Sequence, residues 1–202
     1  MQELNPNIEE ITLEARKAYR FLFQYQQCIL NLMGFICGSL GLKYAGGYSK
    51  FSNTTPRSGR GNLDNWAWDW LNMYFYEFHF EKEDGVKFSV FIINDTGYYD
   101  SACAPFPEKR VNIEEFEIVE KSDTKLIFVA AKNLWDSTQW GEWQSHDFLT
   151  KDLKIEQEDK IMISKVYSLN EFATEDNAIK SLKEFEKYCH QYHIPIQYQK
   201  KL

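Results

Sequence analysis

Five polar side chains in the first half of the chain have the types that phosphate or sugar chemistry requires. Arg57 and Arg60 can donate forked hydrogen bonds to an oxyanion. Asp64, Asp69 and His79 follow them, and a carboxylate or imidazole near a bound substrate could exchange protons with it. One hypothesis is therefore an enzyme, a hydrolase or transferase that acts on a phosphorylated or glycosylated small ligand.

The two arginines belong to a basic segment, residues 43–63, which has four Lys or Arg and no acid in a chain of formal net charge −7. Gly, Ser, Thr and Asn are frequent in this segment, which is typical of a surface loop. Lys50, Arg57 and Arg60 would then bind an anionic ligand or an acidic group of a partner. The alternative is a solvated connector whose charges pair with the protein's own acids.

Tryptophans gather in two short stretches, residues 66–70 and 135–143. Buried tryptophans would be ordinary core residues, exposed ones are frequent hot spots of protein interfaces, and rings beside acids also suit a small-ligand site. The interface interpretation predicts a binding surface made of Lys50, Arg57, Arg60, Trp66, Trp68, Trp70, Trp140 and Trp143.

Enzyme classes with a short signature are not indicated, because no P-loop, dinucleotide fingerprint, G-x-S-x-G or H-E-x-x-H pattern is present. The acidic balance disfavours nucleic acid and anionic membranes, which bind basic surfaces. Our leading hypothesis is a non-catalytic cytosolic binding protein without a cofactor, an inhibitor or adaptor such as an immunity or anti-defence protein. A protein partner with a basic surface would complement the acidic body.

The cysteines and histidines indicate neither a disulfide framework nor a metal site. The four cysteines form no C-x-x-C pair, and the first residues carry acids where a secretory signal would carry bases, so we expect a reducing cytoplasm. Cys189, His190 and His193 have the spacing of ligands on adjacent turns, but a helix C-terminus favours histidine without any metal. We predict no bound metal.

Apolar residues recur every three or four positions over residues 6–38, which predicts a long helix with Asn5 as N-cap and Gly38 and Gly41 near its end. The stripe could join two copies in a homodimer. We favour a core helix packed on a sheet, because a coiled coil usually sustains its pattern for longer and carries charges beside the seam. Gln and Asn side chains interrupt any membrane-length apolar window.

Alternating side chains predict mainly antiparallel strands over residues 74–172, with a hairpin turn at Asp84-Gly85 and a second hairpin formed by residues 114–121 and 124–132. A further helix is predicted over 174–193, capped by Thr174. The sequence thus predicts one α+β domain spanning residues 1–202, an antiparallel meander sheet of five or more strands flanked by the N-terminal and C-terminal helices.

Overall fold

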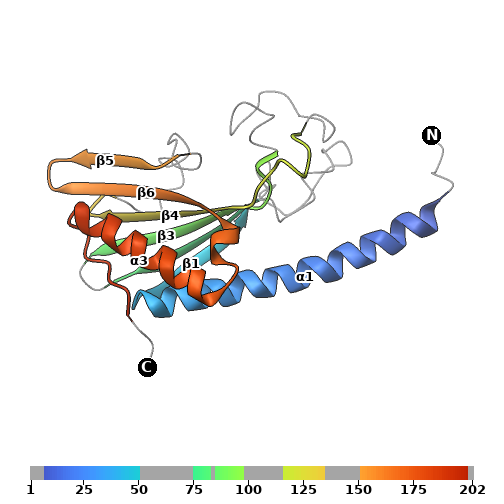
Figure 1. Ribbon diagram of the computed structural model, residues 1–202, viewed down its shortest axis with the longest axis horizontal. Helices are drawn as coiled ribbons and strands as arrows, with labels where there is room; N and C mark the ends of the chain where they lie inside the picture. The colour runs from blue at the N-terminus through green and yellow to red at the C-terminus, as the bar shows by residue number, and fades with distance from the viewer. Residues whose placement is uncertain (1–6, 51–74, 83–84, 98–115, 135–150, 200–202) are drawn as a thin grey trace, which may run out of the picture.

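A computed structural model of the chain describes residues 7–50, 75–82, 85–97, 116–134 and 151–199 (Figure 1). Within these ranges the chain is an α+β domain with a six-stranded antiparallel sheet, which confirms the predicted fold class. The elements are α1 (Ile8–Ser39), β1 (Lys43–Lys50), β2 (Phe75–Glu81), β3 (Val86–Ile93), β4 (Lys125–Lys132), β5 (Leu153–Gln157), β6 (Lys160–Ser168), η5 (Leu169–Phe172) and α3 (Glu175–Gln191).

The strands lie in the order β1-β2-β3-β4-β6-β5. From β1 to β4 each strand pairs with the next one in the chain, as a meander requires. The last two strands exchange places, because β6 pairs with β4 and β5 lies outside it at the edge of the sheet. The two edge strands are therefore β1 and β5.

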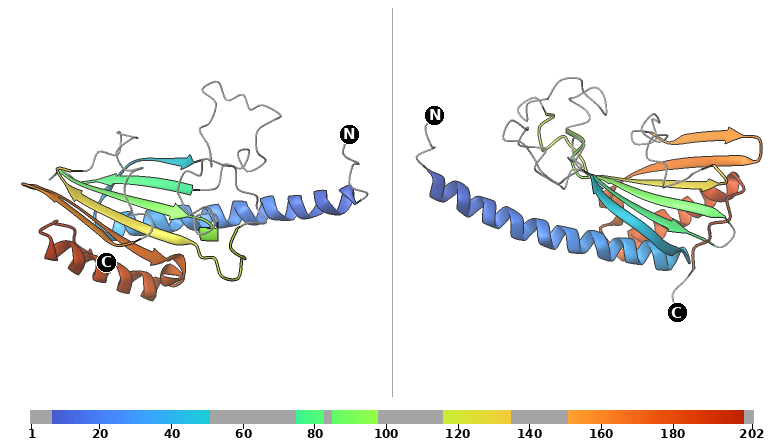
Figure 2. Two further views of the ribbon diagram at one scale, coloured as in Figure 1. Left: turned by 90° about the horizontal axis from the view of Figure 1, so that it is seen from above. Right: turned by 180° about the vertical axis from the view of Figure 1, so that it is seen from behind.

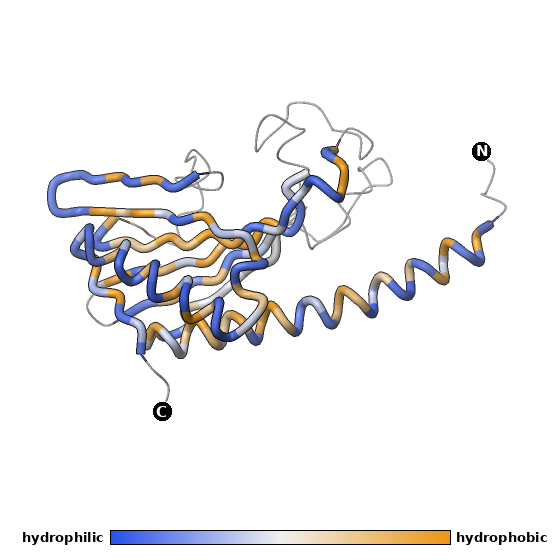
Figure 3. The backbone as a smooth tube through the Cα atoms, in the orientation of Figure 1, coloured by the Kyte–Doolittle hydropathy of each residue, from blue (hydrophilic) through white to orange (hydrophobic). Residues whose placement is uncertain are grey.

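Both helices pack on one face of the sheet, and Figure 2 shows them on the same side of the strands. Buried residues of α1 and α3 form a single core cluster with alternate residues of β2, β3 and β4. Phe128 lies at its centre, with its ring centroid 5.0 Å from that of Phe185 and 5.3 Å from that of Phe88. In Figure 3, hydrophobic colouring marks many residues of the inner strands and of the adjoining half of α1.

Tyr167 is the polar exception in this ring cluster. Its ring packs 5.2 Å from Phe128 and 5.5 Å from Phe172, between centroids. Its hydroxyl is buried and, in the part of the chain that the structure describes, makes no hydrogen bond. Burial raises the pKa of this phenol, and the neighbouring Cys189 thiol adds to the shift. The hydroxyl therefore carries a desolvation cost that no hydrogen bond offsets.

We expect Tyr167→Phe to raise the free energy of unfolding by about 1 kcal/mol, because an unsatisfied buried polar group costs about 1–3 kcal/mol. Urea denaturation followed by circular dichroism measures the change. The matched control is Tyr25→Phe, which removes a hydroxyl that donates to Asn94 Oδ1 at 2.8 Å and should lower stability by about 1 kcal/mol. Destabilisation of both variants by the same amount would contradict the prediction.

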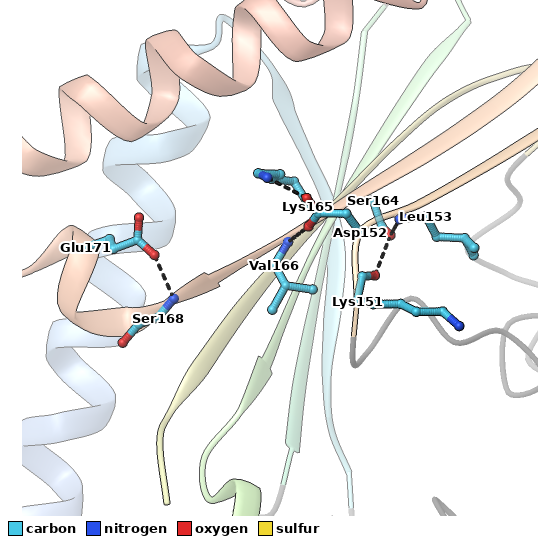
Figure 4. Close-up of polar contacts among 8 residues, drawn as sticks. All are labelled: Lys151, Asp152, Leu153, Ser164, Lys165, Val166, Ser168 and Glu171. Atoms are coloured by element: carbon cyan, nitrogen blue, oxygen red, sulfur yellow. Dashed lines mark hydrogen bonds and ion pairs between the residues drawn. The ribbon is translucent and has the colours of Figure 1, made fainter.

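The edge hairpin β5–β6 is held together partly by side chains (Figure 4). The carboxylate of Asp152 accepts a hydrogen bond from the backbone N–H of Val166 at 2.9 Å and forms an ion pair with Lys165. The Ser164 hydroxyl accepts from the N–H of Leu153 at 3.1 Å. The Ser164 bond reinforces the last backbone register pair, Leu153 with Ser164, and the Asp152 contacts extend the pairing beyond it.

Residues 43–50 are a strand rather than the predicted loop. The glycines that suggested a loop are needed for strand pairing: Gly46 adopts φ +138 where the register shifts between Tyr44 and Gly46. A Cβ at Gly47 would lie 2.9 Å from the carbonyl oxygen of Glu77 on β2. Glycine at both positions therefore permits a bulge and a close approach of β1 to β2. Residues 51–63 of the predicted loop lie outside the described residues.

Three other predicted boundaries need correction. Residues 116–121 are not a strand, because Lys121 and Ser122 donate their N–H groups to Ile118 in a local turn. Helix α1 begins at Ile8 after Asn7 and ends beyond Gly38, and Gly41, with φ +62, follows its last turn. Strand β5 was not predicted at all, because its turn to β6 contains no glycine and uses Glu158 at φ +54. The Thr174 cap of α3 is confirmed by its bond from the N–H of Asn177.

Candidate functional site

Most of the predicted site residues lie outside the described residues: Arg57, Arg60, Asp64, Asp69, Trp66, Trp68, Trp70, Trp140 and Trp143. Lys50 is the last residue of β1, where it pairs with Phe75 of β2. His79 lies inside β2. The binding surface predicted from the tryptophans and the basic segment therefore stays a prediction, and His79 is the candidate whose surroundings can be described.

His79 belongs to a buried polar cluster with Glu77 and Ser89. Glu77 and His79 are two residues apart on β2, so both lie on the face of the sheet opposite the helices, and Ser89 is the register partner of His79 on β3. His79 Nδ1 lies 2.8 Å from the Ser89 hydroxyl, and Nε2 lies 3.8 Å from Glu77 Oε1. The three residues are 4%, 1% and 2% exposed for His79, Ser89 and Glu77.

A hydroxyl, an imidazole and a carboxylate in this sequence of contacts resemble the parts of a Ser-His-Glu hydrolytic triad, in which the imidazole takes the serine proton. Glu77 and Ser89 were not predicted as site residues, although the alternation of β2 shows that Glu77 shares a face with His79. The ring of Phe91 contacts His79 edge-on, with centroids 6.2 Å apart. Nearly complete burial also suits a structural role, in which the cluster joins β2 to β3.

The second candidate is the exposed part of α1. A helix of 32 residues is about 48 Å long, whereas a strand of 8 residues is about 26 Å long. The helix therefore extends past the sheet, and its N-terminal part projects from the body in every ribbon view (Figures 1 and 2). In residues 8–24, which we name the α1 arm, every residue except the half-buried Leu22 is exposed.

The α1 arm exposes large aromatic side chains. Tyr19, Phe21 and Phe23 are 69%, 68% and 71% exposed, and Ile8 and Ile11 are also about half exposed. The two isoleucines share one side of the helix with Tyr19, and the two phenylalanines lie at the borders of that side, whereas most of the charged residues occupy the other side. A single exposed apolar side chain is ordinary on a protein surface, but a contiguous apolar patch marks an interaction site.

The remainder of α1 anchors the arm to the body. Ile29, Met33 and Ile36 are buried in the core cluster beneath the sheet. Tyr25 lies where the helix leaves the sheet, and its hydroxyl donates to Asn94 Oδ1 at the end of β3. Burial raises the pKa of Tyr25 to about 12, and nearby Tyr76 adds to the shift. The arm is thus the continuation of a packed helix, which removes the nucleation cost that an isolated helix would carry.

The prediction of a core helix is correct for only one part of α1. The core-helix prediction holds for Ile29, Met33 and Ile36, which pack on the sheet. It does not hold for the arm, where Ile8, Ile11 and the rings face outward. The sequence contained a sign that the arm is exposed. Some rings of residues 19–23 fall outside the apolar stripe, and a helix packed along its whole length would carry polar residues at those positions.

The Cys-His spacing near the C-terminus does not bring its three side chains together. Cys189 is buried in the core, and this burial raises the pKa of its thiol, whereas His190 and His193 are exposed. In the described ranges, no three His, Cys, Asp or Glu side chains come close enough to hold a metal ion.

A family model described as PM0109 matches residues 5–194. No curated protein and no solved structure matches the chain. The family match covers α1, every strand and α3, so the arm and the buried polar cluster both belong to the matched region. In the described part of the chain, no helix is long and apolar enough to cross a membrane.

Proposed function

We propose that this chain, which belongs to the PM0109 family, is a non-catalytic cytosolic binding protein that acts through protein–protein contact at its α1 arm. The observation that carries the proposal is the exposure of Tyr19, Phe21 and Phe23 on a helix that projects from the body. Exposing such large rings to water is costly. Tyr, Trp and Arg dominate the hot spots of protein interfaces, and aromatic side chains in general are enriched there.

A cytosolic setting is consistent with the cysteines, because the thiols of Cys28 and Cys189 form no disulfide. The arm also has the form of a known recognition mode, in which one apolar side of a helix enters a groove or pairs with another helix. An inhibitor or adaptor role is compatible with this mode, because both act through contact with another protein.

Site-specific photo-crosslinking tests this function. Benzoylphenylalanine placed at Tyr19 or Phe21 should form a covalent adduct with a protein in the cells that make this chain, because an arm in contact lies within reach of its partner. Arg20 is the matched control, since it lies between the two positions in sequence but on the charged side of the helix. Adducts of equal yield at all three positions, or none at Tyr19 and Phe21, would overturn the proposal.

A second function, hydrolysis or group transfer on a phosphorylated or glycosylated small ligand, is favoured by one observation. The His79 imidazole lies between the Ser89 hydroxyl and the Glu77 carboxylate. In that function the Ser89 oxygen would attack the substrate while His79 takes the serine proton at Nδ1 and gives it to the leaving group, whose bond to the transferred group breaks. Glu77 would stabilise the imidazolium, and water would then release the transferred group from Ser89. All three groups are buried, so a substrate has little access to them, and this function is less favoured than protein binding.

A further inference from the structure

We infer that the partner of the α1 arm is a second copy of this chain, and that two arms pair antiparallel about a two-fold axis between residues 16 and 17. The inference rests on the proposed function, because it names the partner of the same surface. Three features of the arm support it: the spacing of its apolar residues, the distribution of large and small side chains, and the distribution of charge along its length.

The apolar stripe of the arm has the spacing of a helix–helix seam. Ile8, Ile11, Ala15, Ala18 and Leu22 follow one another in steps of three and four, which is the heptad spacing of paired helices. The same stripe continues into the buried half of α1, where the protein's own sheet covers it. In the arm the stripe is exposed except at the half-buried Leu22. A second arm would cover it along its whole length with the same pattern.

Side-chain size favours the antiparallel orientation. In the register that places Ala15 opposite Ala18 of the second copy, Ile11 faces Leu22, and the two alanines at the centre allow the helix axes to approach closely. Each exposed ring then lies beside the half of the other arm that carries no ring. A parallel pair would instead place each exposed ring beside its own copy at one crowded end.

Charge favours the same orientation. The acids of the arm, Glu9, Glu10 and Glu14, all precede its bases, Arg16, Lys17 and Arg20. Antiparallel pairing sets the acidic half of each arm beside the basic half of the other and opposes the two helix dipoles, whereas parallel pairing sets like charges together.

Net charge also distinguishes a second copy from the basic partner expected from the acidic composition. The arm has three acids and three bases, so its net charge is zero, and the −7 of the chain belongs to the other residues. A basic partner would therefore be attracted to the body and not to the arm. Two arms have no net repulsion and bury matching apolar stripes.

Sedimentation equilibrium of the full chain tests the inference. We expect a species of twice the 24.0 kDa chain mass. Ala15→Glu and Ala18→Lys should each give a monomer, because an unpaired charge would be buried in the seam. An equimolar mixture of the two variants should recover a heterodimer, since the introduced carboxylate of one chain would face the introduced ammonium of the other only in the antiparallel register. Gln24→Glu, an added charge on the polar side, should remain dimeric.

The outcomes separate this inference from the proposed function. Circular dichroism first confirms that each variant keeps the wild-type helix content. A monomeric wild-type chain that still crosslinks through Phe21 to a different protein would overturn self-association and leave the binding function intact. Dimers that persist in both single variants, or a mixture that stays monomeric, would overturn the seam or its orientation. A monomeric chain that forms no crosslink would overturn both self-association and the proposed binding function.

Discussion

Phe128→Ala is expected to lower the free energy of unfolding by about 3–5 kcal/mol, the range for removing a buried phenylalanine ring. Phe128 is completely buried, and its ring contacts those of Phe88, Tyr167, Phe172 and Phe185. These partners come from β3, β6, η5 and α3, so one substitution weakens the contact between the sheet and the C-terminal helix. A domain of this kind has about 5–15 kcal/mol in total, so the variant should be close to unfolding.

Urea denaturation monitored by tryptophan fluorescence and by circular dichroism measures this loss. The matched control is Phe23→Ala, which removes the same ring from an exposed position in the α1 arm. That variant should change stability by less than about 0.5 kcal/mol in the monomeric state. A loss below about 1 kcal/mol for Phe128→Ala, far under the range for a buried ring, would mean that the ring cluster is not the centre of the core.

His79→Leu is expected to lower the free energy of unfolding by about 1–3 kcal/mol, the range for leaving a buried polar group without its partner. The Glu77 carboxylate would lose the imidazole that lies 3.8 Å from it, and Ser89 would lose the ring nitrogen 2.8 Å from its hydroxyl. The double variant Glu77→Met/His79→Leu should recover much of the loss, because apolar residues of similar volume often replace a buried pair at little cost.

A double-mutant cycle measured by chemical denaturation gives the coupling between Glu77 and His79. Additive losses in the two single variants would show that the two side chains act separately. Ser89→Ala decides the second candidate function in a separate labelling experiment. With a purely structural cluster, the wild-type chain should not be labelled by a fluorophosphonate probe, whereas labelling that disappears in Ser89→Ala would establish Ser89 as a nucleophile.

Secondary structure was predictable from sequence periodicity in elements such as β2 and α3, although the alternation over residues 116–121 wrongly predicted a strand. The alternation of Tyr76, Phe78 and Phe80 in β2, and the stripe of Ala178, Leu182 and Phe185 in α3, each predict the buried face that the structure shows. The start of α3 was also predicted correctly, because the Thr174 hydroxyl caps this helix. In these elements the residues that decide the conformation are neighbours in the chain, so the local sequence contains the necessary information.

Pairing between distant strands was decided by the tertiary structure. Gly46 and Gly47 indicate a loop when taken alone, yet in β1 they allow a bulge and a close approach to the Glu77 carbonyl. Strand β5 is held at the sheet edge partly by side chains: the Asp152 carboxylate accepts from the N–H of Val166 on β6, and the Ser164 hydroxyl on β6 accepts from the N–H of Leu153 on β5. The cluster of His79 with Ser89 likewise depends on the register between β2 and β3. Such contacts join residues whose distance in space the sequence does not specify.

The α1 helix shows the division most directly. Its apolar stripe was determined by the sequence over its whole length, and a homodimer through this helix was one of the two interpretations considered. How much of the stripe is covered was decided by the size of the sheet, because strands of 8 residues, about 26 Å long, cannot span a helix of about 48 Å. Ile36 therefore lies in the core while Ile8 and Phe21 face water. A helix rises less than half as far per residue as a strand, but α1 has four times as many residues as β3. The helix is therefore the longer element, and its N-terminal part extends beyond the sheet as the arm.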